Sequence, residues 1–502
     1  MIRRHVGSEP AFYFSDEIGR GPMADFYDAV DDVIGDWDQV SLPLAGAFNR
    51  GFGRPTDVVL YLKMFLIAYF QNVVFDTRLA ALCSDSISIR RFLGLTLVDR
   101  VPDHSSISRV RDAFAEHGGL HEVLSYVVGL CEEAGLVSGS SVHVDTTLIK
   151  ANAALDSMCA LDTGISVRQH LNEAREQGRK ASVKNSEFYS PRDPESRVRK
   201  KGDDKTMLCY MGVHVTDSKN QVILAARMDY GDSAEVAATL PAVMEAQETL
   251  CVLGKSMDVV SADKGFDSST FHSELENAGL RPATFYQREK KQEGRFSRSD
   301  FTFDAERNLY VCPWGKELGY RGYKEKSFAY VSLVSDCKGC PFRDCCLGQK
   351  AERKELSRTP NEDSSDRNRA FVATKEGKAH LRKRSSTVEP PFGHAKSYGG
   401  LIRINCLGLA KADAKFVTGA VAWNIQKLIK ARKAGIGASP PKPKKPLLEG
   451  TERIETPQPA PNITQTAFET VKKHKTAIHM TLNAFKSLLL SVFIGFRPRA
   501  QT

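Results

Sequence analysis

The stretch Ser141–Ala154, SVHVDTTLIKANAA, decides how the chain is organised, because it has the pattern of a strand that carries a carboxylate toward its carboxyl end. Side chains alternate along a strand, so Val142 and Val144 share one face, while Asp145 and Thr147 share the other. An aspartate on a buried strand is costly unless it is hydrogen-bonded or holds a metal ion. Asp145 is therefore the first candidate metal ligand.

Two further acidic residues are candidates to share that metal. Asp263, in DVVSADKGFD, follows a short apolar strand at 258–262, and we expect it at the carboxyl end of a strand next to that of Asp145. Glu389, in STVEPPFGHAK, directly precedes two prolines. Since a residue before proline avoids helical angles, we expect Glu389 at the entry of a helix. Lys396 lies seven residues further on, close to the same helix face as Glu389.

Three carboxylates suit two magnesium or manganese ions, which are hard cations that take oxygen ligands. Two such ions about 3.5–4 Å apart activate the attacking oxygen and stabilise the leaving oxygen of an in-line phosphoryl displacement. A lysine beside them, here Lys396, can contact a phosphate. A single strand-end aspartate more often caps a turn, so the hypothesis depends on the three positions together.

Length and composition agree with this hypothesis without requiring it. The chain has 502 residues, enough for two to four domains with a sizeable core. Its hydrophobic content of 41% and charged content of 26% are typical of a soluble globular protein. The net charge of +9 is a modest basic excess, which fits either a solvated surface or a polyanionic partner such as DNA.

The sequence predicts neither secretion nor membrane insertion. The first twenty residues are charged and lack an apolar segment with a cleavage site. The longest apolar run, Val58–Phe70, is interrupted by Lys63 and is too short to span a bilayer comfortably, so we interpret it as a buried helix. We therefore expect a cytoplasmic protein with reduced cysteines and no membrane partner.

The periodicity divides the chain into an all-α region and an α/β region. The fold class that we expect is α/β, a mixed sheet with flanking helices, preceded by an all-α amino-terminal domain and interrupted by a small cysteine-rich insertion. The expected parts are a flexible arm at 1–20, a helical DNA-binding domain at 21–137, the catalytic core at 138–287 and 376–434, the insertion at 288–375, and a basic linker and tail at 435–502. Composition leaves open whether the helical domain presents a helix to the major groove or only stabilises the fold.

Several motifs together resemble a known family. HVDTTLIKANAA, ADKGFD and VEPPFGHAK resemble the three acidic motifs of bacterial insertion-sequence DDE transposases of the IS4/IS5-like superfamily, whose core is ribonuclease-H-like. GRPTDVVLYLKMFLIAYF and VPDHSSISRVRDAF are similar to the helical amino-terminal domain of that group. The resemblance covers about residues 20–430.

The resemblance implies that Asp145, Asp263 and Glu389 are a catalytic triad that holds Mg²⁺ or Mn²⁺, and that Lys396 matches the lysine that follows the glutamate. It implies a DNA transposase of the bacterial cytoplasm and nucleoid. Such an enzyme acts as a homodimer on double-stranded DNA, binds terminal inverted repeats, hydrolyses phosphodiester bonds and joins the freed ends to target DNA.

One departure from the family pattern and two other functions stay open. Many relatives have an arginine four residues before the glutamate; here that position is Ser385, and Arg384 lies next to it, which leaves the role of Arg384 undefined. The alternatives are a metal-dependent DNA nuclease without joining activity and an inactive DNA-binding remnant.

The cysteines form a separate signal, since five of the eleven lie between Cys312 and Cys346. Cys337 and Cys340 have the spacing of a metal knuckle, and Cys312 with Cys345 or Cys346 would complete a four-thiolate zinc site. Similar cysteine patterns occur in the insertion of one branch of the resembling family. We expect a structural zinc ion held by Cys312, Cys337, Cys340 and Cys345, with unliganded thiols or an iron–sulfur cluster as alternatives.

Overall fold

The computed structural model describes residues 21–48, 56–179, 182–200, 206–286, 294–324 and 326–436. Within these ranges, residues 21–250 and 255–436 belong to one compact unit. The expected arm at 1–20 and nearly all of the expected tail lie outside the described residues. No helix in the described ranges is long and apolar enough to cross a membrane.

Helices make up the first part of the chain. They are α1 (Ala24–Ile34), α2 (Trp37–Ala45), α3 (Val58–Phe70), α4 (Asp76–Asp85), α5 (Ile87–Phe92), α6 (His104–His117) and α7 (Leu120–Glu133). The interpretation of Val58–Phe70 as a buried helix is confirmed, and even Lys63 within it is 9% exposed. Its amine reaches Asp31 at 2.9 Å and the Phe92 carbonyl at 2.8 Å, which satisfies the charge inside the helical layer.

A mixed sheet follows, as expected from the α/β pattern. Its strands are β1 (Ser141–Lys150), β4 (Arg197–Arg199), β5 (Met207–Asp217), β6 (Ile223–Tyr230), β7 (Val259–Ala262) and β8 (Arg281–Thr284). The order is β4-β5-β1-β7-β8, and β6 also pairs with β5. β1 is antiparallel to β5 but parallel to β7, so it stands where the sheet changes direction.

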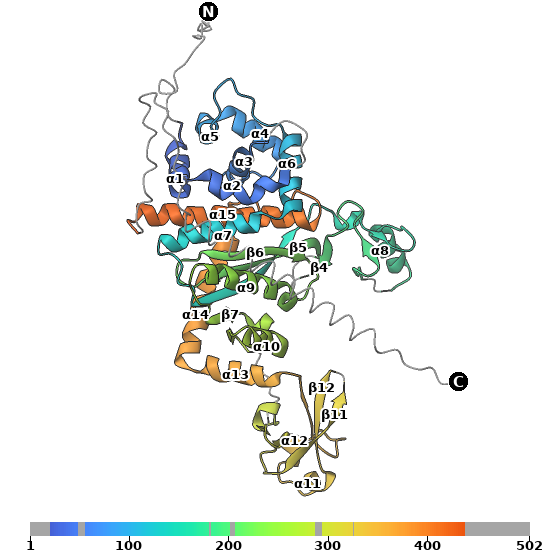
Figure 1. Ribbon diagram of the computed structural model, residues 1–502. Helices are drawn as coiled ribbons and strands as arrows, with labels where there is room; N and C mark the ends of the chain where they lie inside the picture. Colours follow the sequence, from blue (N-terminus) through green and yellow to red (C-terminus); the bar gives the residue numbers. More distant parts are fainter. Residues whose placement is uncertain are drawn as a thin grey trace, which may run out of the picture. The chain divides into compact units, whose positions relative to one another are not determined.

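Helices from distant parts of the sequence cover this sheet (Figure 1). α15 (Leu409–Lys433) packs against β5 and β6 and also against α1, α3, α6 and α7, so it joins the helical region to the sheet. α13 (Glu362–Ala373) and α14 (Lys375–Ser397) pack against β8, and α14 also contacts β1 and β7. α9 (Glu235–Val252) and α10 (Ser269–Asn277) connect the later strands, whereas α8 (Val167–Glu176) lies with the short strands β2 (Cys159–Ala160) and β3 (Phe188–Tyr189) in an excursion after β1.

The expectation that Glu389 lies at a helix entry is wrong. α14 begins at Lys375 and continues through Pro390 and Pro391. The reason is a buried stripe at helical spacing that runs through the prolines: Gly377, Leu381, Arg384, Val388, Pro391, Phe392 and Ala395. Packing of this stripe outweighs the local preference of the residue before proline.

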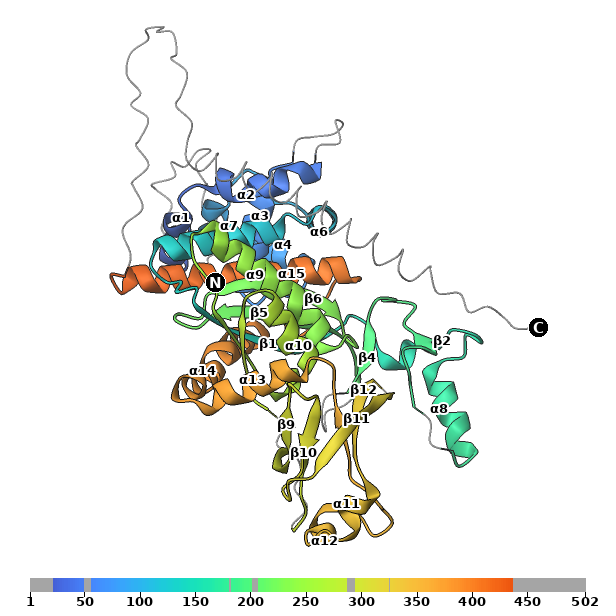
Figure 2. The ribbon, with the colours of Figure 1, turned by 60° about the horizontal axis from the view of Figure 1, so that its bottom comes forward.

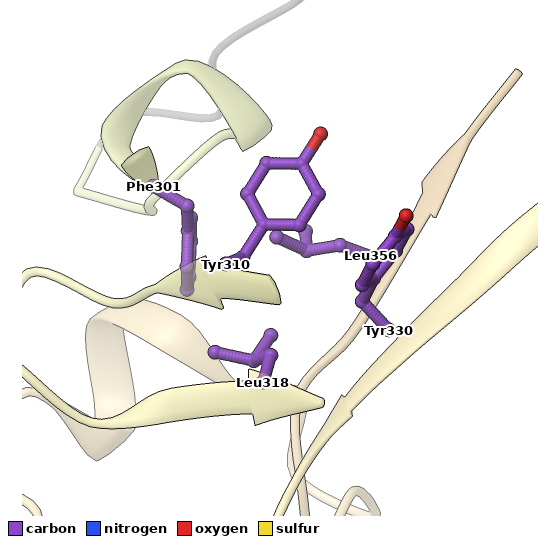
Figure 3. Close-up of a cluster of buried hydrophobic side chains, with 5 residues drawn as sticks. All are labelled: Phe301, Tyr310, Leu318, Tyr330 and Leu356. Carbon is purple, nitrogen blue, oxygen red and sulfur yellow. The ribbon is translucent and has the colours of Figure 1, made fainter. Parts of the chain in front are cut away.

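The cysteine-containing insertion has a sheet of its own (Figure 2). Its strands are β9 (Thr302–Asp304), β10 (Leu309–Val311), β11 (Glu317–Lys324), β12 (Ser327–Ser332) and β13 (Glu355–Arg358), in the order β13-β12-β11-β10-β9. The short helices α11 (Val334–Lys338) and α12 (Arg343–Cys346) lie between β12 and β13 in the sequence. Figure 3 shows the buried cluster of this sheet, which consists of Phe301, Tyr310, Leu318, Tyr330 and Leu356.

Candidate active site

Asp145 and Asp263 lie at the same level of two neighbouring strands. β1 and β7 are parallel, with Val142 opposite Val260 and His143 opposite Ser261. The same offset brings Asp145 to the level of Asp263, the residue that directly follows β7. Residues at the same level of adjacent strands point to the same face of a sheet. The expectation that Asp263 belongs to the strand next to that of Asp145 is therefore confirmed.

The Asp263 carboxylate also shapes the turn after β7. One of its oxygens accepts a hydrogen bond from the Gly265 backbone N–H at 2.8 Å. A Cβ atom on Gly265 would lie 2.8 Å from a carboxylate oxygen of Glu235 and 3.0 Å from that of Asp263, so a larger residue here would displace these carboxylates. Glu235, which forms an ion pair with Arg199 at 3.4 Å, thus brings a further carboxylate to this turn. No sequence pattern singles out Glu235, because it starts a helix far from any of the three acidic motifs.

Arg384 neutralises Asp145. Its guanidinium nitrogen Nη2 lies 2.9 Å from Oδ1 of Asp145, and Nε and Nη2 each donate to the Val144 carbonyl at 3.3 Å. The arginine is buried, with 8% of its surface exposed. A buried ion pair with additional hydrogen bonds is held in a defined geometry, because either charge alone would be costly to bury. Arg384 therefore fixes the orientation of the Asp145 carboxylate.

α14 runs alongside β1 in the same direction. His380 contacts Ser141 at 3.0 Å, Arg384 contacts Asp145, and Lys396 donates to Oγ1 of Thr147 at 2.6 Å. Two turns of helix place Glu389 close to the face of Lys396. The exposed Glu389 side chain therefore lies, along the helix, between the residues that contact β1 at positions 145 and 147.

The three acidic motifs meet in one region, but their carboxylates do not form a closed ligand set. Among the described residues, no group of three or more His, Cys, Asp or Glu side chains is arranged to hold a metal ion. The donors themselves suit a hard divalent cation, since Asp145, Asp263 and Glu389 offer only carboxylate oxygens. The structure thus brings the two aspartates to one level and leaves Glu389 exposed on the neighbouring helix.

Two buried histidines beside this region serve the core. Burial lowers the pKa of His143 and that of His214 to about 3, so both are neutral. The His214 ring stacks between Phe392 of α14 and Phe416 of α15, with centroid distances of 4.3 and 4.5 Å. These contacts pack α14 and α15 against β5. They therefore fix the position of α14, which carries Glu389 and Arg384, relative to the sheet.

The cysteines gather in the insertion without forming a metal centre in the described structure. Cys312 follows β10, and its sulfur accepts a hydrogen bond from the Lys316 backbone N–H at 3.3 Å. Cys337 lies 3.1 Å from the Ser332 hydroxyl. Burial raises the pKa of Cys346, and the neighbouring thiols of Cys337, Cys312 and Cys340 add to the shift. Cys346 also packs, like Cys312, against the buried cluster of the insertion. The sequence could not separate Cys346 from Cys345 as a candidate ligand.

Comparisons with known proteins identify the family. No curated protein matches the chain. A solved structure titled as a piggyBac transposase synaptic complex with hairpin DNA aligns over 83% of this chain and 76% of that one at 9% identity, with a TM-score of 0.32, which is too low to support a conclusion. Two family models match: "Transposase domain (DUF772)" over residues 17–113 and "Transposase DDE domain" over residues 311–429. The second match includes Arg384, Glu389 and Lys396. The chain is a DDE transposase of the insertion-sequence type, an enzyme that cleaves DNA and transfers its strands.

Proposed function

We propose that Asp145, Asp263 and Glu389 are the catalytic carboxylates of this transposase, and that together they hold the divalent ions of a two-metal site. The observation that carries the proposal is the parallel pairing of β1 with β7, which sets Asp145 level with Asp263. α14 supports it, because its contacts to β1 bracket Glu389. Enzymes with a transposase DDE domain generally depend on divalent metal ions; we propose Mg²⁺ or Mn²⁺ here.

The reaction is a pair of phosphoryl transfers. In the first, the oxygen of a water molecule bonds to phosphorus at the end of the element, and the bond from phosphorus to the 3′ oxygen breaks. That oxygen takes up a proton and becomes a free 3′ hydroxyl. In the second, the oxygen of this hydroxyl loses its proton and bonds to a phosphorus of the target DNA. The bond from that phosphorus to the target's own 3′ oxygen breaks, and this oxygen takes up a proton. Bound divalent ions would lower the pKa of the attacking group and stabilise the leaving oxygen.

Lys396 and Arg384 have distinct roles in this proposal. Lys396 lies on the same helix face as Glu389, and its amine donates to Oγ1 of Thr147. When DNA binds, the amine donates instead to a phosphate oxygen of the substrate. Arg384 is a positioning residue: it holds Oδ1 of Asp145 and the Val144 carbonyl, and so keeps the carboxylate at a fixed orientation. Glu389 completes the ligand set from the exposed face of α14.

The wider assignments follow from the sequence and the mixed sheet. We propose a ribonuclease-H-like core within 138–287 and 376–434, a helical DNA-binding domain within 21–137 and the insertion at 288–375, in an enzyme of the IS4/IS5-like superfamily. A central strand with antiparallel neighbours on one side and parallel neighbours on the other supports such a core. The partner is double-stranded DNA with terminal inverted repeats, bound by a homodimer in the bacterial cytoplasm.

Magnesium-dependent cleavage of DNA that carries the ends of the element tests the triad. We expect Asp145→Asn and Glu389→Gln each to lower the cleavage rate by about 10³-fold or more, because a lost ligand removes stabilisation of the transition state. Glu376→Gln, an exposed carboxylate at the start of the same helix, is the matched control. Undiminished cleavage by Asp145→Asn would remove this residue from the mechanism. A strand-transfer assay on the same DNA separates a transposase from a nuclease that only cuts.

Structural zinc in the insertion is a separate proposal. We propose that Cys312, Cys337, Cys340 and Cys345 hold one Zn²⁺ ion. Cys346 is the competing fourth ligand because, like Cys312, it packs against the buried cluster of the insertion. Metal analysis of the purified protein is expected to give one zinc per chain, which is lost in Cys337→Ser. Loss of zinc in Cys346→Ser but not in Cys345→Ser would assign the fourth ligand to Cys346, and a metal-free protein would contradict the site.

A further inference from the structure

One face of the β11–β12 hairpin carries a row of aromatic rings. One end of this row lies in the buried cluster of the insertion, and the other end is exposed to solvent. Residues directly opposite each other in an antiparallel pair lie on the same face. Tyr320 pairs with Tyr330, and Tyr323 pairs with Phe328. Tyr330 belongs to the buried cluster and is 2% exposed, whereas Tyr320 is 46% exposed and Tyr323 is 59% exposed. Figure 3 shows the buried end of this row.

The rings form a continuous row rather than scattered surface residues. Ring centroids lie 5.8 Å apart between Tyr320 and Tyr330, 6.0 Å between Tyr320 and Phe328, and 5.3 Å between Tyr323 and Phe328. The strand register shifts between Tyr320 and Gly322. This bulge inserts one extra residue, so Tyr323 stays on the face of Tyr320 although three positions separate them. Without the bulge, strand alternation would turn Tyr323 to the opposite face.

Basic side chains accompany the exposed rings. Arg321, Lys324 and Lys326 are all exposed on the hairpin. They outnumber the two acidic residues of the hairpin, Glu317 and Glu325. Aromatic rings interleaved with cations are the chemistry of a surface that stacks bases and contacts phosphates. An apolar protein partner would not explain the exposed cations of this hairpin.

We propose that this hairpin face binds unpaired nucleotides of the DNA substrate. Bases inside a duplex are already stacked on their neighbours, so an exposed tyrosine ring can stack only on a base that has left the duplex. The cations hold the adjoining phosphates. The inference rests on the proposed function, because cleavage at the ends of the element is the source of freed strands.

Binding of the full-length protein to a fluorescein-labelled 20-nucleotide oligo(dT) and to a 20-base-pair duplex tests the proposal. Binding is followed by fluorescence anisotropy in buffer without Mg²⁺, Mn²⁺ or a chelator, so that zinc in the insertion is kept. We expect the double variant Tyr320→Ala/Tyr323→Ala to weaken oligo(dT) binding by about 10-fold or more, and duplex binding by less than about 2-fold. Tyr320→Phe/Tyr323→Phe keeps the rings and is expected to bind as the parent does. Phe342→Ala is the control within the insertion, since this ring is 40% exposed but lies outside the row.

Photocrosslinking locates the contact directly. Oligo(dT) with 5-iododeoxyuridine is expected to crosslink to peptides within 317–332. Crosslinks elsewhere, together with unchanged binding by the alanine double variant, would overturn the proposal. A change of oligomeric state in the double variant with unchanged oligo(dT) binding would also overturn it, because the face would then bind a second copy. The binding assay contains no Mg²⁺ or Mn²⁺ and does not depend on cleavage, so failure of the catalytic assignments would leave this result unchanged.

Discussion

The two sheets of the molecule use their faces differently. In the mixed sheet, β5 is buried along nearly all its length, and α14 and α15 pack against it. In the insertion sheet, a cluster of five buried residues supports one end, and the row of rings then continues into solvent. The two sheets therefore position functional groups in different ways. In the mixed sheet, strand register brings Asp145 level with Asp263, whereas in the insertion sheet the tyrosine rings lie on a face that no other element covers among the described residues.

The largest effect on stability is expected from removing a ring of α15 that packs against the mixed sheet. Phe416 is fully buried and stacks on His214, and a Cβ atom added to Gly212 would lie 2.6 Å from its ring. Phe416→Ala is expected to lower the free energy of unfolding by about 4 kcal/mol, because it opens a cavity that rigid neighbours cannot fill. Urea unfolding measures the change. An unchanged midpoint would show that β5 and α15 are less tightly packed than the structure indicates.

A substitution in the insertion core shows whether the two sheets unfold separately. Leu318 is fully buried in the insertion cluster. Leu318→Ala is expected to cost about 3 kcal/mol, and the loss to be confined to the insertion. Hydrogen exchange followed by mass spectrometry is expected to show lost protection in peptides within 302–358 and unchanged protection in β1 and β5. Equal loss in both sheets would mean that they form one cooperative unit.

The pH dependence of stability should follow an ion pair of the helical layers. His121 on α7 lies 2.7 Å from Glu245 and 2.8 Å from Asp413, and Arg227 also contacts Glu245. Burial lowers the pKa of His121, but hydrogen bonds and charge from Asp413 and Glu245 outweigh it and raise the pKa to about 9. Because the folded pKa lies above the ordinary value of 6.5, the stabilisation is complete below pH 6.5 and is lost as pH rises through 9.

The measurement compares the parent with His121→Asn across this range. We expect a difference in unfolding free energy of about 2–3 kcal/mol at pH 6, which shrinks toward pH 9.5. His117→Asn is the control, because the ring of His117 is hydrogen-bonded to the Pro43 carbonyl and not to a carboxylate. A difference that stays constant between pH 6 and 9.5 would contradict a protonated His121 in the folded protein.

The smallest effect is expected at the exposed end of the insertion sheet. Tyr323 is 59% exposed and its contacts are confined to the hairpin. Tyr323→Ala is expected to change the free energy of unfolding by less than about 0.5 kcal/mol. Thermal unfolding of Tyr323→Ala, of Leu318→Ala and of the parent under the same conditions measures this change. A cost near that of Leu318→Ala would mean that the ring serves the fold, and would weaken its assignment to nucleotide binding.

The two strands that carry the aspartates could be predicted from the sequence. Alternating side chains located β1, and a short apolar run ahead of Asp263 located β7. The position of Glu389 could not be predicted, because the preference of a residue before proline is local, whereas the stripe on α14 that overrides it is recognised only when the helix packs on β1 and β7. The ion pair between Arg384 and Asp145 was equally hidden, since it joins positions 239 residues apart.

The sequence by itself determined the types of residue available for the chemistry: carboxylates after two strands and on one helix, a lysine two turns beyond, and a group of thiols. These follow from short-range pattern and residue type. Only the tertiary structure decided which groups meet, because contact between β1, β7 and α14 depends on strand pairing and on helix packing over long separations. The same holds for the tyrosine row, whose common face depends on a bulge that appears only once β11 and β12 pair.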